Sequence, residues 1–242
     1  MIMNFEGRRV LVTGGGSGIG RALAIELQNK KARVAICGRH QEKLDAVAGQ
    51  YPGMVGIQAD ITRGEEIETL HDTLEKRFGG IDILINNAGR MVQFDVQKGI
   101  PDSADAEVRL NFLAPMYLIR RFLPGLMSRS DAAIINVSSG YALWPSKSAP
   151  VYCATKAALH AFTKSLRWQL EGTSVNVIEL IPPLVATESA VIKGGMSPDN
   201  FARLVVHKMQ LGEQEILVSE VRLLELGRRV WPGLVDRVMK KR

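Results

Sequence analysis

Short apolar runs alternate with longer segments of helical period along most of this chain. The runs lie at residues 10–12, 33–37, 54–59, 81–85, 132–137 and 174–180, with a shorter one at 215–218. Helical periods occupy residues 21–30, 41–48, 62–78, 106–128 and 151–172. Strands that alternate with helices in this way are joined by right-handed crossovers. The pattern therefore predicts an α/β fold built on a parallel sheet.

Local signals predict where some of these helices begin or break. Thr62 with Glu65 three residues later matches a capping box, which would start the following helix. Pro115 and Pro124 lie inside the segment 106–128, and proline removes a backbone donor and crowds the preceding turn. We expect a kink or a break in that helix.

The pattern loosens in the last quarter of the chain. Polar, glycine-bearing residues predict a substrate lid around 183–212, and Ser197 is the expected cap of a helix within it. A helical period returns over 220–242. Because no repeat, low-complexity tract or linker interrupts the chain, we expect a single domain over residues 1–242.

Composition and charge narrow the class of protein. The chain is 46% hydrophobic and 23% charged, and its net charge of +6 is spread out except for a basic end that suits a solvated helix terminus. A nucleic-acid partner is not expected, because the sequence has no basic stripe with interleaved aromatic residues. No apolar run approaches the ~18 residues of a membrane span, and no signal-peptide pattern is visible. We expect a cytoplasmic protein.

Cysteine and histidine usage argues against disulfides and metals. Cys37 and Cys153 cannot form a disulfide framework by themselves, and the four histidines match no ligand spacing. We expect no metal site.

The sequence TGGGSGIG of residues 13–20 directly follows the first apolar run and opens a helical segment. Strand, glycine turn and helix form the first half of a dinucleotide-binding unit. Glycines let the pyrophosphate approach the main chain, and the helix dipole favours its charge. The spacing differs from G-x-G-x-x-G, so a flexible glycine loop is the alternative for this motif alone.

The end of the second apolar run predicts the cofactor type. NAD-binding proteins place a carboxylate there for the ribose 2′-hydroxyl, whereas this chain has Gly38 followed by Arg39. A guanidinium at this position favours a 2′-phosphate. The pattern favours NADP(H) over NAD(H), the alternative being that Arg39 is an ordinary surface charge.

Tyr152 and Lys156 lie four residues apart, hence on one face of the predicted helix 151–172. An ammonium there favours the phenolate, so we expect Lys156 to lower the tyrosine pKa from about 10. Chance pairs at this spacing are common. Ser139, however, follows the run 132–137 at the sheet edge where parallel sheets bind ligands, which favours a catalytic interpretation.

Taken together, these motifs resemble the short-chain dehydrogenase/reductase family over nearly the whole chain. The matching residues are the loop 13–20, Asp60, Asn86-Asn87-Ala88-Gly89, Asn111, Ser139 and Tyr152-x-x-x-Lys156. The resemblance implies a Rossmann-type doubly wound parallel sheet of order 3-2-1-4-5-6-7 with helices on both faces. It also implies nicotinamide-dependent carbonyl/alcohol chemistry, and a homodimer or homotetramer formed through the helices around 106–128 and 151–171.

The resemblance further implies a role for each matching residue. Ser139 would bind the substrate oxygen, Tyr152 would exchange a proton with it, Lys156 would hold the nicotinamide ribose, and Asn111 would hold a water in a proton relay. The implied cofactor-binding residues are Gly14, Ser17, Gly18, Ile19, Gly20, Arg39, Asp60, Ile61, Asn87, Ala88, Gly89, Tyr152, Lys156, Pro182, Val185 and Thr187.

Two departures from the family pattern look like the subgroup that includes DltE-type proteins. Pro183 replaces the usual glycine after the sixth strand, which predicts a stiffer loop. The run 215–218 and a basic helix replace the glycine-rich end of the seventh strand. The resemblance does not settle the substrate.

Candidate substrate-pocket residues are mostly apolar, although packing in the core or lid is the alternative for each. They are Met91, Gly140, Leu143, Trp144, Val151, Leu184, Met196 and Phe201. The sequence thus predicts an NADP(H)-dependent oxidoreductase that acts on the carbonyl or alcohol of a small or medium apolar substrate. The alternative is a non-catalytic NADP(H)-binding sensor or scaffold, which would have no use for a proton-transferring tyrosine.

Overall fold

The computed structural model describes residues 3–183, 185 and 195–218. Leu184, Thr187, most of the predicted lid before Ser197 and the predicted helical end 220–242 lie outside the described residues.

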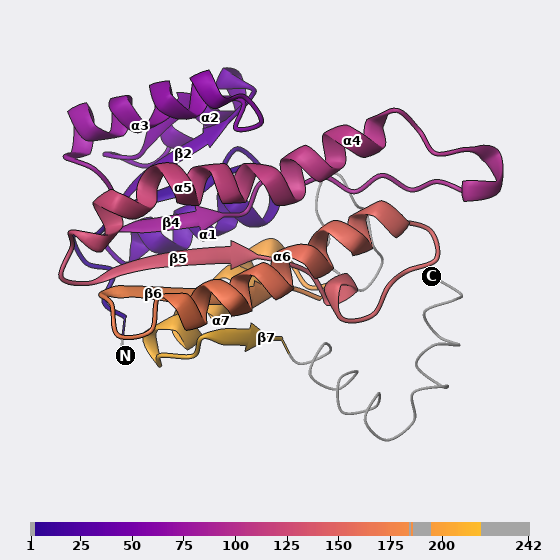
Figure 1. The fold of residues 1–242 in the computed structure, drawn as a ribbon. Helices are drawn as coiled ribbons and strands as arrows, with labels where there is room; N and C mark the ends of the chain where they lie inside the picture. The colour runs from indigo at the N-terminus through magenta and orange to yellow at the C-terminus, as the bar shows by residue number, and fades with distance from the viewer. Residues whose placement is uncertain (1–2, 184, 186–194, 219–242) are drawn as a thin grey trace.

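Seven parallel strands form one sheet in the order β3-β2-β1-β4-β5-β6-β7, which confirms the predicted topology (Figure 1). The strands are β1 (Arg9–Thr13), β2 (Arg33–Gly38), β3 (Val55–Gln58), β4 (Ile83–Asn86), β5 (Ala132–Val137), β6 (Val175–Ile181) and β7 (Glu215–Leu217). The strand order reverses between β1 and β4. In open parallel sheets the ligand crevice lies at such a reversal, beyond the carboxyl ends of the strands.

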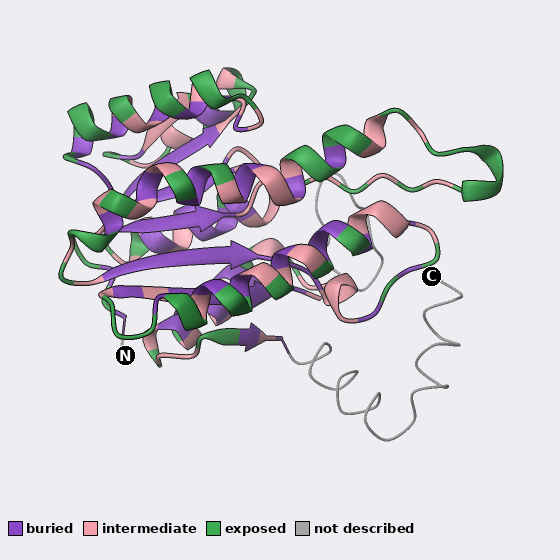
Figure 2. Cartoon of the chain, viewed as in Figure 1, coloured by how far each residue is buried: buried purple, intermediate pink, exposed green. Residues whose placement is uncertain are grey.

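Helices cover both faces of the sheet. They are α1 (Gly18–Asn29), α2 (Gln41–Ala48), α3 (Gly64–Phe78), α4 (Ser103–Val108), α5 (Ala114–Met127), α6 (Pro150–Gln169) and α7 (Pro198–Gln210). One core cluster joins the sheet to α1, α2 and α7, and a second joins it to α3, α5 and α6. Figure 2 shows the central strands buried between these layers. Burial on both faces explains why the strands are continuous apolar runs.

The predicted start of α3 is wrong. The helix begins at Gly64 after Arg63, and no side chain caps it. The Thr62 hydroxyl donates instead to the Asp60 carboxylate at 2.7 Å. The carboxylate of Glu66, rather than that of Glu65, accepts the Asp60 backbone N–H at 2.6 Å. Thr62, which suggested the capping box, therefore holds the loop at the end of β3 together with Glu66.

The segment predicted as a long, kinked helix is broken, as expected, although it begins earlier than predicted, at Ser103. A π-helical turn, η2 (Arg109–Leu113), separates α4 from α5. Pro115 lies in the first turn of α5, where its missing N–H costs little, and Pro124 lies inside the helix. π-Helical turns are frequent at functional sites, and this one contains Asn111.

The described part of the predicted lid includes a core helix. Ser197 caps α7 as predicted, since its side chain accepts the Asn200 N–H at 3.2 Å. Phe201 and Val205 are completely buried in the cluster that α7 shares with α1. Helix α7 is therefore part of the core rather than of a lid.

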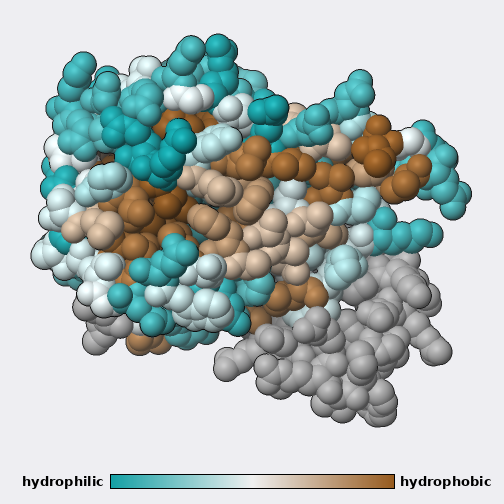
Figure 3. All heavy atoms as spheres, in the orientation of Figure 1, coloured by the Kyte–Doolittle hydropathy of each residue, from teal (hydrophilic) through white to brown (hydrophobic). Residues whose placement is uncertain are grey.

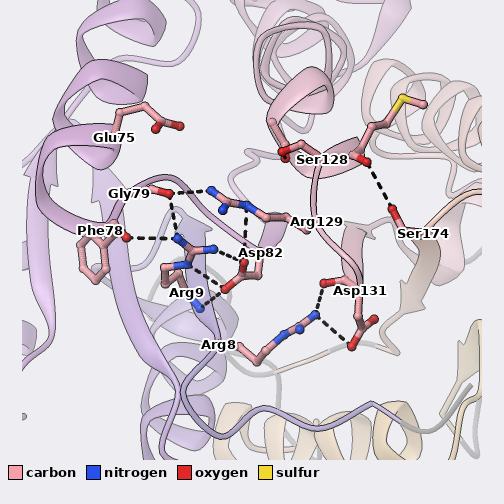
Figure 4. A network of polar contacts seen from close by, with 12 residues as sticks. Arg8, Arg9, Glu75, Phe78, Gly79, Asp82, Ser128, Arg129, Asp131 and Ser174 are labelled. Carbon is pink, nitrogen blue, oxygen red and sulfur yellow. Dashed lines mark hydrogen bonds and ion pairs between the residues drawn. The ribbon is translucent and has the colours of Figure 1, made fainter.

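The amino-terminal edge of the sheet carries a polar network that holds the fold together (Figure 4). Asp82 accepts bonds from the backbone N–H and the guanidinium Nε of Arg9, both at 2.9 Å. Arg9 also donates to the Gly79 carbonyl at 2.7 Å, and Arg8 pairs with Asp131 at 3.0 Å. These polar groups bond to one another, at the edge opposite the glycine loop.

Candidate active site

A cleft of about 660 Å³ lies at the carboxyl edge of the sheet. In Figure 1 the arrowheads of β5 and β7 point toward this edge, where α6 begins. The described residues predicted to bind the cofactor all line the cleft, namely Gly14, Ser17, Gly18, Ile19, Gly20, Arg39, Asp60, Ile61, Asn87, Ala88, Gly89, Tyr152, Lys156, Pro182 and Val185. The fold therefore brings together residues that are far apart in the sequence.

The glycine loop is packed too closely to carry side chains at its key positions. A Cβ on Gly20 would lie 2.3 Å from the Gly14 carbonyl oxygen and 2.4 Å from Nδ2 of Asn87. Asn87 Nδ2 donates to the Thr13 carbonyl at 2.9 Å, and the N–H groups of Asn87 and Ala88 both donate to the Thr13 hydroxyl at 3.0 Å. These bonds join the ends of β1 and β4. The loop leaves backbone exposed to the cleft, as a pyrophosphate requires.

Basic side chains gather at the end of the cleft beside β2. Arg39 lines the cleft together with His40 and Lys43. Burial raises the pKa of Asp60, but hydrogen bonds from Thr62 and the charge of Arg39 outweigh it and hold the carboxyl pKa below its ordinary value. Sequence reasoning did not identify Lys43, whose signal is its position four residues after Arg39, at the start of α2.

Ser139, Tyr152 and Lys156 meet at the end of β5. Ser139 precedes a short 3-10 turn, η3 (Gly140–Ala142), and its hydroxyl accepts the Tyr141 N–H at 3.1 Å. It also hydrogen-bonds Tyr152, which is half-buried on α6. The Tyr141 ring meets the Tyr152 ring edge-on at 6.2 Å. Lys156 Nζ donates to the Val137 carbonyl at 2.8 Å and lies 5.8 Å from the centroid of the Tyr152 ring.

Burial dominates the electrostatics of this group. It raises the pKa of Tyr152 to about 12, against a hydrogen bond with Ser139 that lowers it. It lowers the pKa of Lys156 to about 8, against the charges of Glu179 and Glu107 that raise it. The tyrosine pKa is therefore raised, not lowered from about 10 as the sequence predicted, even with the Lys156 ammonium nearby. The reason is that loss of solvation disfavours the charged form of both groups.

Asn111 is completely buried, and its amide is bonded to the chain. Its Oδ1 accepts the Arg90 N–H at 2.9 Å, while Nδ2 donates to the Arg90 carbonyl at 2.8 Å and to the Thr155 hydroxyl at 3.1 Å. That hydroxyl donates to the Tyr152 carbonyl at 2.8 Å. Both amide hydrogens are used, so a relay water would bind through Oδ1 or the backbone. Sequence reasoning did not identify Arg90 or Thr155.

Only some of the residues predicted for the substrate pocket lie on the wall of the cleft. Met91 lines the cleft. Phe201 belongs to the core, and Trp144 packs against Ile181 with 4% exposure, so neither is on the cleft wall. The other described candidates, Gly140, Leu143, Val151 and Met196, do not line it either. In their place the cleft has Arg90, Leu110, Tyr141 and Pro183, which sequence reasoning did not assign to it.

Membrane spans and metal clusters are both absent from the described residues. Within that part of the chain, no helix is both long and apolar enough to cross a membrane. The same residues contain no group of three or more histidine, cysteine, aspartate or glutamate side chains that could hold a metal ion.

The doubly wound sheet, the glycine loop and the Ser-Tyr-Lys group at one edge define a nicotinamide-dependent oxidoreductase. The sequence profile of the short chain dehydrogenases matches residues 8–193, and the chain belongs to this family. It is 38% identical over 230 residues to an uncharacterized oxidoreductase, DltE, of Bacillus subtilis (strain 168), which covers 90% of this chain and 91% of that protein. The predicted DltE-like subgroup is thereby confirmed.

Solved structures agree with this assignment. A short chain dehydrogenase from Burkholderia cenocepacia J2315, in complex with NADP, is 28% identical and superposes with a TM-score of 0.87 over 98% of this chain and 99% of that one. A 3-ketoacyl-(acyl-carrier-protein) reductase from Brucella melitensis, complexed with NADH, is 26% identical with a TM-score of 0.80 over 84% and 90% of the two chains. The protein is an NAD(P)-dependent short-chain dehydrogenase/reductase.

Proposed function

We propose that the protein uses NADP(H) to interconvert the carbonyl and alcohol forms of a small or medium apolar substrate. The observation that carries this proposal is the continuous cleft that runs from the basic cluster at Arg39 and Lys43 to Ser139 and Tyr152. The end at Arg39 and Lys43 suits the binding of a phosphate, and the end at Ser139 and Tyr152 suits a proton transfer.

Different residues of the cleft would bind different parts of the cofactor. The backbone of the loop 13–20 would hold the pyrophosphate, and Arg39 with Lys43 would hold the 2′-phosphate. Asp60 and Ile61 would lie by the adenine, and residues 87–89 would form the bed beneath the nicotinamide half. Lys156 would hold the ribose hydroxyls. Pro182 and Val185, together with Thr187 outside the described residues, would contact the nicotinamide end.

The protein's own part in the reaction is positioning and proton transfer. Bound NADPH supplies a hydride to the carbonyl carbon. The Ser139 hydroxyl donates a hydrogen bond to the substrate oxygen, and Tyr152 gives its proton to the same oxygen. A raised pKa keeps Tyr152 protonated at neutral pH, which suits an acid in the reducing direction. In the oxidising direction Tyr152 is the base, and the Lys156 charge favours the phenolate that results.

The alternative of a sensor or scaffold without turnover is less well supported. Binding a dinucleotide requires the glycine loop but no tyrosine that bonds a serine at the cleft wall, and this chain has that pair. Leu110, Tyr141 and Met91 on the wall favour an apolar substrate. Both cysteines are buried free thiols, which is compatible with a cytoplasmic location.

We also propose a homodimer or homotetramer in which α5 and α6 meet their symmetry mates. Figure 3 shows apolar residues gathered over the face that these helices present. On these two helices, Tyr117, Met127 and Trp168 are 38%, 48% and 60% exposed. Light scattering on Trp168→Glu should give a smaller assembly than the wild type, and an unchanged mass would contradict this interface.

The function is tested by titrating NADPH and NADH while nicotinamide fluorescence is followed. Wild type should prefer NADPH, and Arg39→Ala should lose about 10–100-fold in NADPH affinity, the contribution of a charge-assisted hydrogen bond. Lys43→Ala should lose less NADPH affinity than Arg39→Ala. NADH affinity should not change.

The matched control is Lys76→Ala, which removes one exposed positive charge from α3. It should bind both nucleotides like the wild type. Equal affinity of the wild type for NADPH and NADH would refute the NADP(H) preference. Absence of binding to either would refute the oxidoreductase function itself.

A further inference from the structure

Two side chains on successive turns hold the backbone on either side of Met91. Asn111 bonds both the N–H and the carbonyl of Arg90, as described above. Glu107, four residues earlier on α4, accepts the Val92 N–H on Oε1 at 3.1 Å. Three hydrogen bonds therefore fix the segment 90–92 to one helical run.

This segment forms a wall of the cleft. Arg90 and Met91 both line it, and the Met91 side chain is the apolar member of the pair. A little further along, the Phe94 N–H donates to the Ser148 carbonyl at 3.0 Å, which ties the same loop to the segment before α6. Since the backbone is fixed on both sides of Met91, the direction of its Cα–Cβ bond, from which the side chain extends, is fixed as well.

Glu107 is an unusual anchor because its carboxyl group is completely buried. Its Oε2 has no hydrogen-bond partner among the described residues. Burial raises the pKa of the carboxyl, while the bond from Val92 and the charges of Arg90 and Lys156 lower it. A buried carboxyl with an unpartnered oxygen costs folding free energy, and leucine would fill the space at a lower cost. Packing alone does not explain a glutamate here.

We propose that Glu107 is a positioning residue that sets the size of substrate the cleft accepts, by holding Val92 and thereby directing the Met91 side chain. The inference rests on the proposed carbonyl reduction. It assigns to Glu107 no contact with substrate or cofactor.

The first test distinguishes the role of the Glu107 side chain as a hydrogen-bond acceptor from the role of its charge. Glu107→Leu removes the acceptor, whereas Glu107→Gln keeps a carbonyl oxygen for the Val92 N–H. Initial rates with NADPH are measured for propanal and for the bulkier phenylacetaldehyde. Glu107→Leu should change the ratio of the two KM values about tenfold, the effect of one lost hydrogen bond, with kcat and NADPH affinity within about twofold of wild type. Glu107→Gln should restore most of the wild-type ratio.

Three further variants control for folding and locate the effect. Asp105→Leu removes an exposed carboxylate from the same helix and should leave the ratio unchanged. Val92→Pro removes the donor from the loop side, outside the core, and should reproduce the Glu107→Leu ratio even if that variant fails to fold. Met91→Ala should change the ratio by itself and abolish any further effect of Glu107→Leu, as expected for two residues that act through one contact.

Amide hydrogen exchange over residues 90–94 tests, without any enzymatic turnover, whether Glu107 holds the backbone around Met91. Exchange should be faster in Glu107→Leu and Val92→Pro, and close to wild type in Glu107→Gln and Asp105→Leu. Unchanged exchange in the first two variants, or unchanged KM ratios in an active enzyme, would overturn the inference. If the wild type reduces neither aldehyde but the exchange pattern appears, the substrate class fails and the positioning role stands.

Discussion

Lys156 Nζ donates a hydrogen bond of 2.8 Å to the backbone carbonyl of Val137. Val137 is the last residue of β5, directly before Ser138 and Ser139, and Lys156 lies one helical turn after Tyr152. This bond, together with one of 2.9 Å from Asn136 Nδ2 to the Thr163 hydroxyl, ties the strand that delivers the serine to the helix that delivers the tyrosine. It also holds the ammonium in a buried place, where its pKa falls to about 8.

Removal of the Tyr152 hydroxyl should abolish turnover and spare binding. Tyr152→Phe deletes the proposed acid, so kcat for carbonyl reduction should fall by about 10²–10⁴-fold. NADPH affinity, measured by nicotinamide fluorescence, should stay within a few-fold of wild type. Tyr141→Phe is the matched control, because Tyr141 lies edge-on to the same ring in the cleft wall and has no proposed proton role. Equal losses in both variants would contradict the assignment.

The Lys156 charge should set an alkaline limit to the reaction. With a pKa of about 8, Lys156 loses its proton above that pH, and kcat/KM for NADPH should decline there. Lys156→Arg keeps the charge at all accessible pH values, so any residual activity should lose this alkaline limb. The measurement is the pH profile of kcat/KM from about pH 6 to 10, on both sides of the lysine pKa. If the decline of kcat/KM near pH 8 persists in Lys156→Arg, a group other than Lys156 causes it.

A methyl group on the glycine loop should be far more damaging than one on α5. The Cβ of Gly20→Ala would lie 2.3 Å from a backbone oxygen, and such overpacking costs about 1–3 kcal/mol of unfolding free energy. Dinucleotide binding should weaken with it. Gly125→Ala, in helix α5, meets no atom within 4 Å and should stabilise the fold by about 0.5–1 kcal/mol. Urea unfolding of both variants tests this contrast, which a stable, NADPH-binding Gly20→Ala would refute.

The ion pair between His160 and the buried carboxylate of Glu179 should make the free energy of unfolding depend on pH. His160 Nδ1 lies 2.9 Å from a Glu179 carboxylate oxygen, and this bond raises the pKa of the histidine, against burial that lowers it. A raised folded-state pKa means that the stabilisation is complete below the unfolded value, near 6.5, and is lost as the pH rises through the folded value.

The difference in unfolding free energy between wild type and His160→Leu should therefore be larger at about pH 6 than at about pH 9. His207→Leu, which replaces an exposed histidine on α7, is the control for the loss of a surface imidazole that has no such ion-pair partner among the described residues. If the His160→Leu difference grows as the pH rises, the ion pair with Glu179 is not the source of the stabilisation.

The sequence predicted the framework because its signals are local or periodic. Continuous apolar runs of strand length, separated by helical periods, allow one kind of sheet, and the observed strand order agrees with it. Gly14 was predictable because its backbone has a positive φ, and Gly20 because the carbonyl of Gly14 in the same loop leaves no room for a Cβ. Tyr152 and Lys156 were predictable because helical spacing alone places them on one face.

Only the tertiary structure decided which groups meet and how deeply they are buried. Thr62 had the spacing of a helix cap, yet it bonds to Asp60, because the loop competes for the same hydroxyl. Glu107 had no sequence signal that set it apart from a solvated helix residue, yet it is completely buried and holds Val92, next to the cleft residue Met91. The same is true of the Tyr152 pKa, whose direction follows from loss of water around the ring. Burial and hydrogen-bond partners arise from segments distant in the sequence, and a one-dimensional pattern contains no record of their packing.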